Sequence, residues 1–272
     1  MEPSATAAAG RRAPVAELRL RLSSAPAPYL EGALDNPALG SRELLLLLRN
    51  GAAPRELLLR VARERRWTAF RQVQKALALH PAAPPAMTRR YLPYLAWTDV
   101  GELTISPRVH PLTRRHAEAN LLRRLDGLTL GERVALARRA CRPVLDRLLA
   151  TREPLVLRGS LGNTRLVEHD VAALAGDPSC GAELLVLLAH HVVWGERRSV
   201  RFELARNASL PLHEALRVVG RLAPRDLRRL VQDPTCRRLV RVRAERLLLE
   251  RSPTDRVGIH RTGADERPPR GA

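Results

Sequence analysis

The sequence is poor in lysine, in aromatic residues and in cysteine. Lys75 is the only lysine, and aromatic residues make up 3% of the 272 positions. Leucine, valine and alanine must therefore form most of any core, which suits thin layers of helices better than a deep globular centre. The three cysteines, Cys141, Cys180 and Cys236, are odd in number and far apart. This pattern argues against a disulfide framework and indicates a reducing compartment.

Long apolar runs and enzyme motifs are also missing. No stretch reaches the roughly 18 to 20 apolar residues of a membrane span, and the first residues lack the apolar segment of a secretory signal. We therefore expect a cytoplasmic protein with no membrane partner. Glycine-rich phosphate loops, paired cysteine motifs and a histidine pair four residues apart are absent. We accordingly predict no catalytic residue, no cofactor, no metal and no small-molecule substrate.

The positive charge is large and comes almost entirely from arginine. Lysine and arginine number 47 against 28 aspartates and glutamates, which leaves a formal charge of +19. A composition rich in Arg, Ala and Pro accounts for arginine in place of lysine, but it does not explain the shortage of acidic residues. Such a surplus attracts polyanions at low salt. The charge predicts a macromolecular partner of acidic character, either protein or nucleic acid.

The chain repeats itself, with a constant offset of 127 between the numbers of corresponding residues. The segment WTAFRQVQKALALH, residues 67–80, returns as WGERRSVRFELARN, residues 194–207. Aligning residues 10–122 with 137–249 without a gap gives 33 identities in 113 pairs. We interpret the chain as a tandem duplication, with one copy over residues 10–136 and the other over residues 137–252. Residues 1–9 are expected to form a disordered tail, and residues 253–272 a flexible one.

Short amphipathic segments fill both copies. Leucines at i, i+3 and i+4 recur over about 8 to 15 residues, between Asn, Asp, Gly or Pro residues that end helices. Each short helix has one apolar face that it cannot bury alone, so stacking of neighbours is expected. The pattern predicts an all-α protein whose two copies form one continuous stack.

The repeating strings resemble known helical arrays. LDNPALGSRELLLLLRNGAAPRELLLRVA (34–62) and LGNTRLVEHDVAALAGDPSCGAELLVLLA (161–189) are similar to units of HEAT-like α-solenoids and of bacterial leucine-rich repeat variant proteins. The resemblance covers about residues 10–250 and implies a right-handed, armadillo-like α-solenoid that acts as a protein-binding scaffold. It also implies Asp–Arg pairs between neighbouring repeats, for which Asp99 with Arg114 and Asp226 with Arg241 are the candidates.

Two sets of residues are candidates for contact with a partner. Repeat-equivalent positions of a solenoid face the same way, so six arginines are expected along one surface: Arg71, Arg90, Arg114, Arg198, Arg217 and Arg241. Tyr91, Tyr94 and Trp97 share one face of a predicted helix end beside arginines, where rings can stack on nucleobases. A solvated arginine face and ordinary packing of the aromatic rings are the structural alternatives.

Three functions remain open from the sequence. The first is a non-enzymatic scaffold that binds an acidic partner through a basic face. The second is a DNA glycosylase for alkylated bases, because HEAT-like glycosylases are basic helical arrays that use an aspartate among aromatic residues; Asp99, Trp97 and Tyr94 are the local candidates. The third is a protein-protein scaffold without affinity for polyanions.

Overall fold

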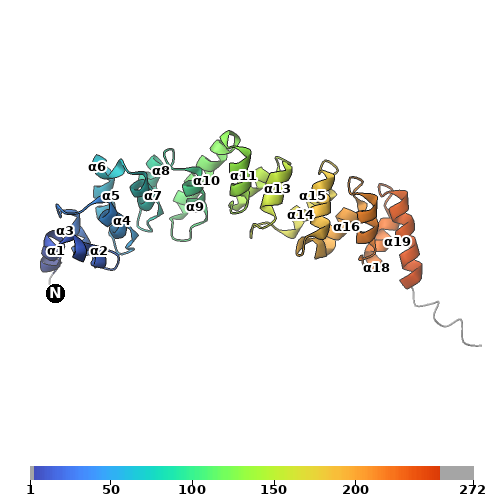
Figure 1. Cartoon of the computed structure of the whole chain (residues 1–272), viewed down its shortest axis with the longest axis horizontal. Coiled ribbons are helices and arrows are strands. Elements are labelled where there is room, and N and C mark those ends of the chain that lie inside the picture. Colours follow the sequence, from blue (N-terminus) through green and yellow to red (C-terminus); the bar gives the residue numbers. More distant parts are fainter. Residues whose placement is uncertain (1–2, 252–272) are drawn as a thin grey trace, which may run out of the picture. The chain divides into compact units, whose positions relative to one another are not determined.

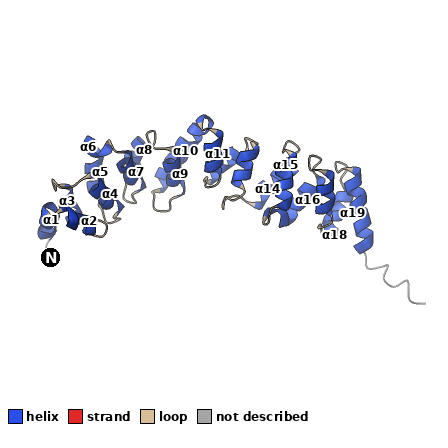
Figure 2. Ribbon diagram, viewed as in Figure 1, coloured by secondary structure: helices blue, strands red, loops and turns tan. Residues whose placement is uncertain are grey.

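The computed structural model describes residues 3–251, and its regular structure is helical throughout that range (Figure 2). No strand occurs among these residues, so the all-α prediction is confirmed. The chain divides between Leu166 and Val167 into two compact units. Among the described residues, none of the helices is long and apolar enough to cross a membrane.

The helices of the first unit are short and follow one another closely along the chain (Figure 1). They are α1 (Pro3–Arg12), α2 (Val15–Arg21), α3 (Ala27–Leu34), α4 (Ser41–Arg49), α5 (Arg55–Arg63), α6 (Arg65–Thr68), α7 (Arg71–Leu79), α8 (Pro85–Tyr91), α9 (Trp97–Ile105), α10 (Pro111–Arg124), the 3-10 helix η1 (Leu125–Gly127), α11 (Leu130–Ala137), α12 (Arg142–Leu149) and α13 (Pro154–Ser160).

The second unit has the same character. Its described elements are α14 (Glu168–Gly176), α15 (Ala182–His190), the 3-10 helix η2 (Trp194–Glu196), α16 (Arg198–Arg206), α17 (Leu212–Val219), α18 (Pro224–Gln232) and α19 (Arg238–Arg251). Adding 127 to both bounds of α4, α5, α7, α9 and α10 gives the bounds of α14, α15, α16, α18 and α19. The same offset relates the starts of α1, α2, α3 and α8 to those of α11, α12, α13 and α17.

The first helix lies where the sequence predicts a disordered tail. Residues 3–12 form α1, which packs directly on α3. A Cβ atom at Gly32 would lie 1.9 Å from the carbonyl oxygen of Ala7, so the two backbones touch. Contact through glycine and alanine leaves no apolar period in the sequence, which is why the expectation for residues 1–9 was wrong from residue 3 onward. The predicted tail over 253–272 lies outside the described residues.

Within the first unit, neighbouring helices bury each other's apolar faces. α2, α4, α7 and α9 pack in succession, while α8 packs against α10 and α10 against α12. α4 buries Leu44, Leu47 and Leu48, and α7 buries Val73 and Leu77. Helices this short are marginal alone in water, so this mutual burial provides most of their stability.

Buried asparagines join the ends of successive helices. Asn36 donates from its side-chain amide to the carbonyls of Gly10 and Ala13, at 3.0 and 2.8 Å. Asn163, the corresponding residue of the second copy, makes the same pair of bonds to the carbonyls at positions 137 and 140, at 2.8 and 3.1 Å. In both asparagines, Oδ1 accepts a hydrogen bond of 2.9 Å from the backbone N–H two residues further along the chain. Asn50 and Asn207 form the same kind of turn.

His80 occupies the position that corresponds to Asn207. Its Nε2 lies 3.1 Å from the carbonyl of Asn50, and its Nδ1 lies 3.1 Å from the N–H of Ala82. Because a carbonyl only accepts and a backbone N–H only donates, the ring is neutral with its proton on Nε2. Burial lowers the pKa of His80 below its usual range.

This lowered pKa predicts a pH dependence of stability. The unfolded chain protonates His80 as pH falls below about 6.5, whereas the folded chain resists, so acidification favours unfolding. Lowering the pH from 7.5 to 5.0 should lower the thermal midpoint of both proteins. We expect the decrease to be smaller in His80→Asn than in the wild type, by about 2 °C or more. Midpoints are read by circular dichroism. Equal losses in both proteins would assign the dependence to other groups.

Candidate partner-binding groove

Two of the six candidate arginines tie neighbouring helices together. Arg198 holds Asp226 with two bonds, Nε to Oδ2 at 2.6 Å and Nη2 to Oδ1 at 2.8 Å. These bonds hold the pKa of the Asp226 carboxyl below its usual range. The corresponding Arg71 Nε lies 3.9 Å from Oδ2 of Asp99. Both aspartates stand in the first turn of their helices, and their arginine partners are Arg71 and Arg198 instead of the expected Arg114 and Arg241.

The other four candidate arginines are dispersed. Arg114 donates to the carbonyl of Ser106 at 3.2 Å, which places it at the far end of α9 from Arg71. Arg217 binds the buried Glu214 at 2.7 Å. Arg90 is exposed in the last turn of α8, and Arg241 lies within electrostatic range of Asp233 at the end of α18.

The three candidate aromatic rings have different surroundings. The hydroxyl of Tyr91 donates to the carbonyl of Ala62 at 3.4 Å, and its ring packs against the core. Tyr94 is 71% exposed. The indole N–H of Trp97 donates to Glu132 at 2.8 Å. Of the three, Trp97 alone lines the pocket between α9 and α11.

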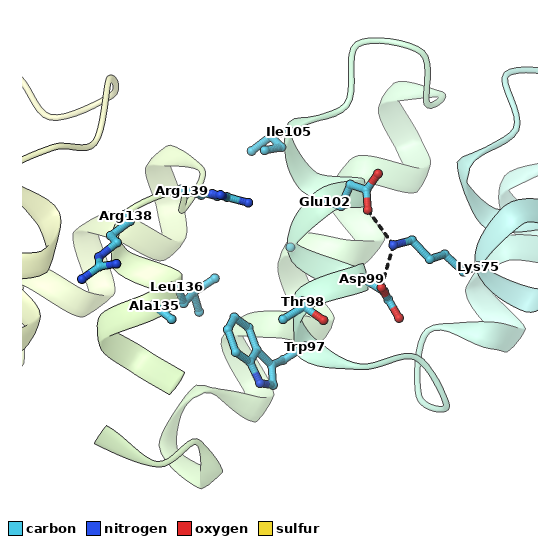
Figure 3. Close-up of a pocket in the computed structure, with 11 residues that line it drawn as sticks. Lys75, Trp97, Thr98, Asp99, Glu102, Ile105, Ala135, Leu136, Arg138 and Arg139 are labelled. Carbon is cyan, nitrogen blue, oxygen red and sulfur yellow. Dashed lines mark ion pairs between the residues drawn. The ribbon is translucent and has the colours of Figure 1, made fainter. Parts of the chain in front are cut away.

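A pocket of about 470 Å³ lies between α9 and α11. Trp97, Asp99, Glu102 and Ile105 line it from α9, Ala135 and Leu136 from α11, and Lys75 reaches it from α7 (Figure 3). Arg138 and Arg139, which directly follow α11, complete the lining. The pocket thus combines an apolar floor with charged side chains.

Lys75 organises the acidic side of this pocket. Its Nζ lies 2.8 Å from Oε2 of Glu102 and 2.9 Å from Oδ1 of Asp99 (Figure 3). The bonds to Glu102 and then to Asp99 raise the pKa of Lys75, so it stays charged. Arg138 and Arg139 are exposed, and their side chains have no acidic partner in the part of the chain that the structure describes.

A second pocket, of about 640 Å³, adjoins the first because Lys75 and Glu102 line both. Leu45, Leu48, Ala76 and Leu79 supply its apolar lining, and Gln72 and His80 contribute polar groups. Arg49 and Arg108 also line it, are exposed, and lack an acidic partner within residues 3–251. We call the two pockets together the Lys75 groove. Its lining has five lysine or arginine side chains and two acidic ones.

Lys75 and several residues around it have no counterpart 127 positions further along the chain. The positions that correspond to Lys75 and Glu102 are Phe202 and Arg229, whose guanidinium lies 4.2 Å from the ring centroid. Trp97 corresponds to Pro224 and Ile105 to Gln232. The Arg–Asp pairs and the buried asparagines, in contrast, occur in both copies. Of the charged groove residues, Asp99, Arg138 and Arg139 are also repeated, as Asp226, Arg11 and Arg12, whereas Lys75 and Glu102 are not.

The sequence did not single out most of this groove. Lys75 stood out only as the chain's single lysine, and Arg138 and Arg139 are one pair of adjacent arginines among several in the sequence. A position-by-position comparison of the two copies contains the missing signal, since Lys75, Glu102 and Trp97 all change. Asp99, the candidate residue for a glycosylase, lines the first pocket but is held by Lys75 and Arg71.

No metal or family relationship defines this surface. Within residues 3–251, no three His, Cys, Asp or Glu side chains are placed to hold a metal ion. Comparisons with protein-family models, with curated proteins and with solved structures find no match for the chain.

Proposed function

We propose that the chain is a non-enzymatic, HEAT-like helical-repeat scaffold that binds an acidic macromolecule through the Lys75 groove. The shared helix bounds, and the asparagine bonds that return at the corresponding positions of the second copy, support a tandem duplication of one helical unit. Arrays of this kind present extended surfaces to other macromolecules.

One observation carries the binding proposal. Two exposed arginines line each pocket of the groove, Arg138 and Arg139 in the first and Arg49 and Arg108 in the second, and none of them has an acidic partner among the described residues. Arg198 and Arg217 are neutralised by acidic partners, whereas Arg55 and Arg115, outside the groove, also lack one within residues 3–251. The four groove arginines differ from these in lying beside concave apolar surface. Unpaired arginines beside concave apolar surface are suited to charge-assisted hydrogen bonds with carboxylates or phosphates.

A double charge reversal tests this function. We expect Arg138→Glu/Arg139→Glu to weaken the binding of labelled polyglutamate at least about tenfold, which corresponds to about 1.4 kcal/mol. The matched control is Arg55→Glu/Arg115→Glu, which makes the same charge change at two exposed positions of the same unit outside the groove. Fluorescence anisotropy gives Kd for the wild type and both variants.

The control decides the interpretation. Equal weakening in both variants means that net charge alone attracts the polyanion, and the groove proposal falls. If neither the wild type nor either variant binds polyglutamate at low salt, the remaining function is a protein-protein scaffold without affinity for polyanions. If the wild type excises methylated bases and Asp99→Asn abolishes that activity, the protein is a DNA glycosylase and the scaffold proposal is wrong.

A further inference from the structure

We propose that the Lys75 groove binds an extended peptide segment in which acidic residues alternate with large apolar ones. This inference rests on the proposed function and names the class of partner. The relevant features are the two apolar floors of the groove, the arginines beside each floor, and the two carboxylates at its centre.

The apolar floors favour a peptide over a nucleic acid. Ile105, Leu136 and the ring of Trp97 face the first pocket, and Leu45 and Leu79 face the second. Nucleobases can stack on the ring of Trp97, but the rest of the apolar lining is aliphatic, and leucine-sized side chains gain free energy by entering it. Large apolar side chains in the partner therefore match both pockets.

The carboxylates of Asp99 and Glu102 also favour a peptide over a nucleic acid. Asp99 and Glu102 stand in the middle of the groove, and their oxygens lie 2.9 and 2.8 Å from Lys75 Nζ. A continuous row of phosphates would pass over both carboxylates at a cost in repulsion. A peptide avoids this cost because it is free to place an N–H or a neutral side chain there. The exposed amide of Gln72 adds a donor and an acceptor for peptide backbone.

The arginines determine where the acidic residues belong. Arg49 and Arg108 line one pocket and Arg138 and Arg139 the other, so carboxylates are needed near both ends of the bound segment. Packed helices lie about 8–10 Å apart, and an extended chain advances about 3.3 Å per residue. The groove reaches from α4 across α7 and α9 to α11, which is three such spacings, so it accommodates about seven to nine residues.

Four labelled probes separate the possible partners. The first is a peptide of repeated Glu-Glu-Leu, the second replaces each Leu by Ser, the third replaces each Glu by Gln, and the fourth is an oligothymidylate of equal charge. We expect the Glu-Glu-Leu peptide to bind at least about tenfold more tightly than each of the other three, because only it satisfies both the arginines and the apolar floors.

A variant built from the second copy locates the effect. Leu45→Ala/Ile105→Gln introduces the residues found at positions 172 and 232, which the corresponding helices α14 and α18 accommodate. This variant should bind the Glu-Glu-Leu peptide about tenfold more weakly than the wild type does, and the Glu-Glu-Ser peptide with unchanged affinity. Circular dichroism and the thermal midpoint confirm that the variant is folded.

The outcomes are distinct. If oligothymidylate binds as tightly as the Glu-Glu-Leu peptide, or if Leu and Ser peptides bind equally, the peptide inference is overturned while the proposed acidic-partner function stands. If the variant weakens both peptides equally, the apolar floors are not the recognition element and the inference also falls. If no probe binds, the inference and the proposed function fail together.

Discussion

Replacing Asn36 by leucine is expected to destabilise the first unit by about 3 kcal/mol, because buried carbonyls lose their donors. Asn36 is 7% exposed. Its side-chain NH2 donates to the carbonyls of Gly10 and Ala13, and its side-chain oxygen accepts from the N–H of Ala38. Leucine has a similar size but can make none of these three bonds. The shift of the urea midpoint, followed by circular dichroism, measures the loss.

Three comparison variants test whether the amide group is the cause. Asn36→Asp keeps an oxygen for Ala38 but removes both donors, so it should be about as damaging as leucine at neutral pH. Asn163→Leu removes the equivalent bonds and should cost a similar amount. Gln72→Ala, at an exposed position, should stay within about 0.5 kcal/mol of the wild type. A mild effect of Asn36→Asp would mean that the donated bonds contribute little.

Placing a single methyl group on Gly32 is expected to separate α1 from α3. The added Cβ would lie 1.9 Å from the oxygen and 2.7 Å from the carbon of the Ala7 carbonyl, and backbone atoms cannot move aside as flexible side chains do. Overpacking of this kind costs about 1–3 kcal/mol or more. We expect Gly32→Ala to expose α1, with hydrogen exchange over residues 3–12 at least about tenfold faster.

The chain contains a graded series of controls for this substitution. At Gly159, which corresponds to Gly32, a Cβ would lie 3.0 Å from the Val134 carbonyl oxygen, so Gly159→Ala should have a smaller effect. At Gly51 nothing lies within 4 Å of the added atom, so Gly51→Ala should leave exchange unchanged. The effect of Gly159→Ala is read over α11, Leu130–Ala137, because Val134 belongs to that helix. The same rate over residues 3–12 in Gly32→Ala and Gly51→Ala would show that α1 is not held by this contact.

The helices were predictable because their signals are local. Leucines spaced three and four residues apart indicate the apolar faces of α4 and α5, and Asn36 and Asn50 indicate where helices end. α1 escaped prediction because its contact with α3 depends on the absence of side chains at Gly10 and Gly32. No apolar period marks such a contact, and it becomes visible only when both backbones are placed.

The candidate site was harder to predict because the relevant property is pairing between distant residues. Comparison of the copies correctly grouped Arg71 with Arg198, but that comparison cannot show that each faces an aspartate at the start of a later helix. Lys75 gains its importance from Glu102, on another helix. The groove also requires α9 and α11 to lie side by side, which no single segment encodes.

The helical class and the positions of the turns follow from the sequence, because periodicity and helix-ending residues act over a few neighbours. The offset of 127 between corresponding residues is likewise a property of the sequence. Which charges are neutralised depends on the tertiary structure. Arg198 is held by a buried aspartate, while Arg138 and Arg139 stand beside a pocket without an acidic partner among the described residues. The reason is that electrostatic energy depends on distance in space, and residues far apart in sequence are brought together only by packing.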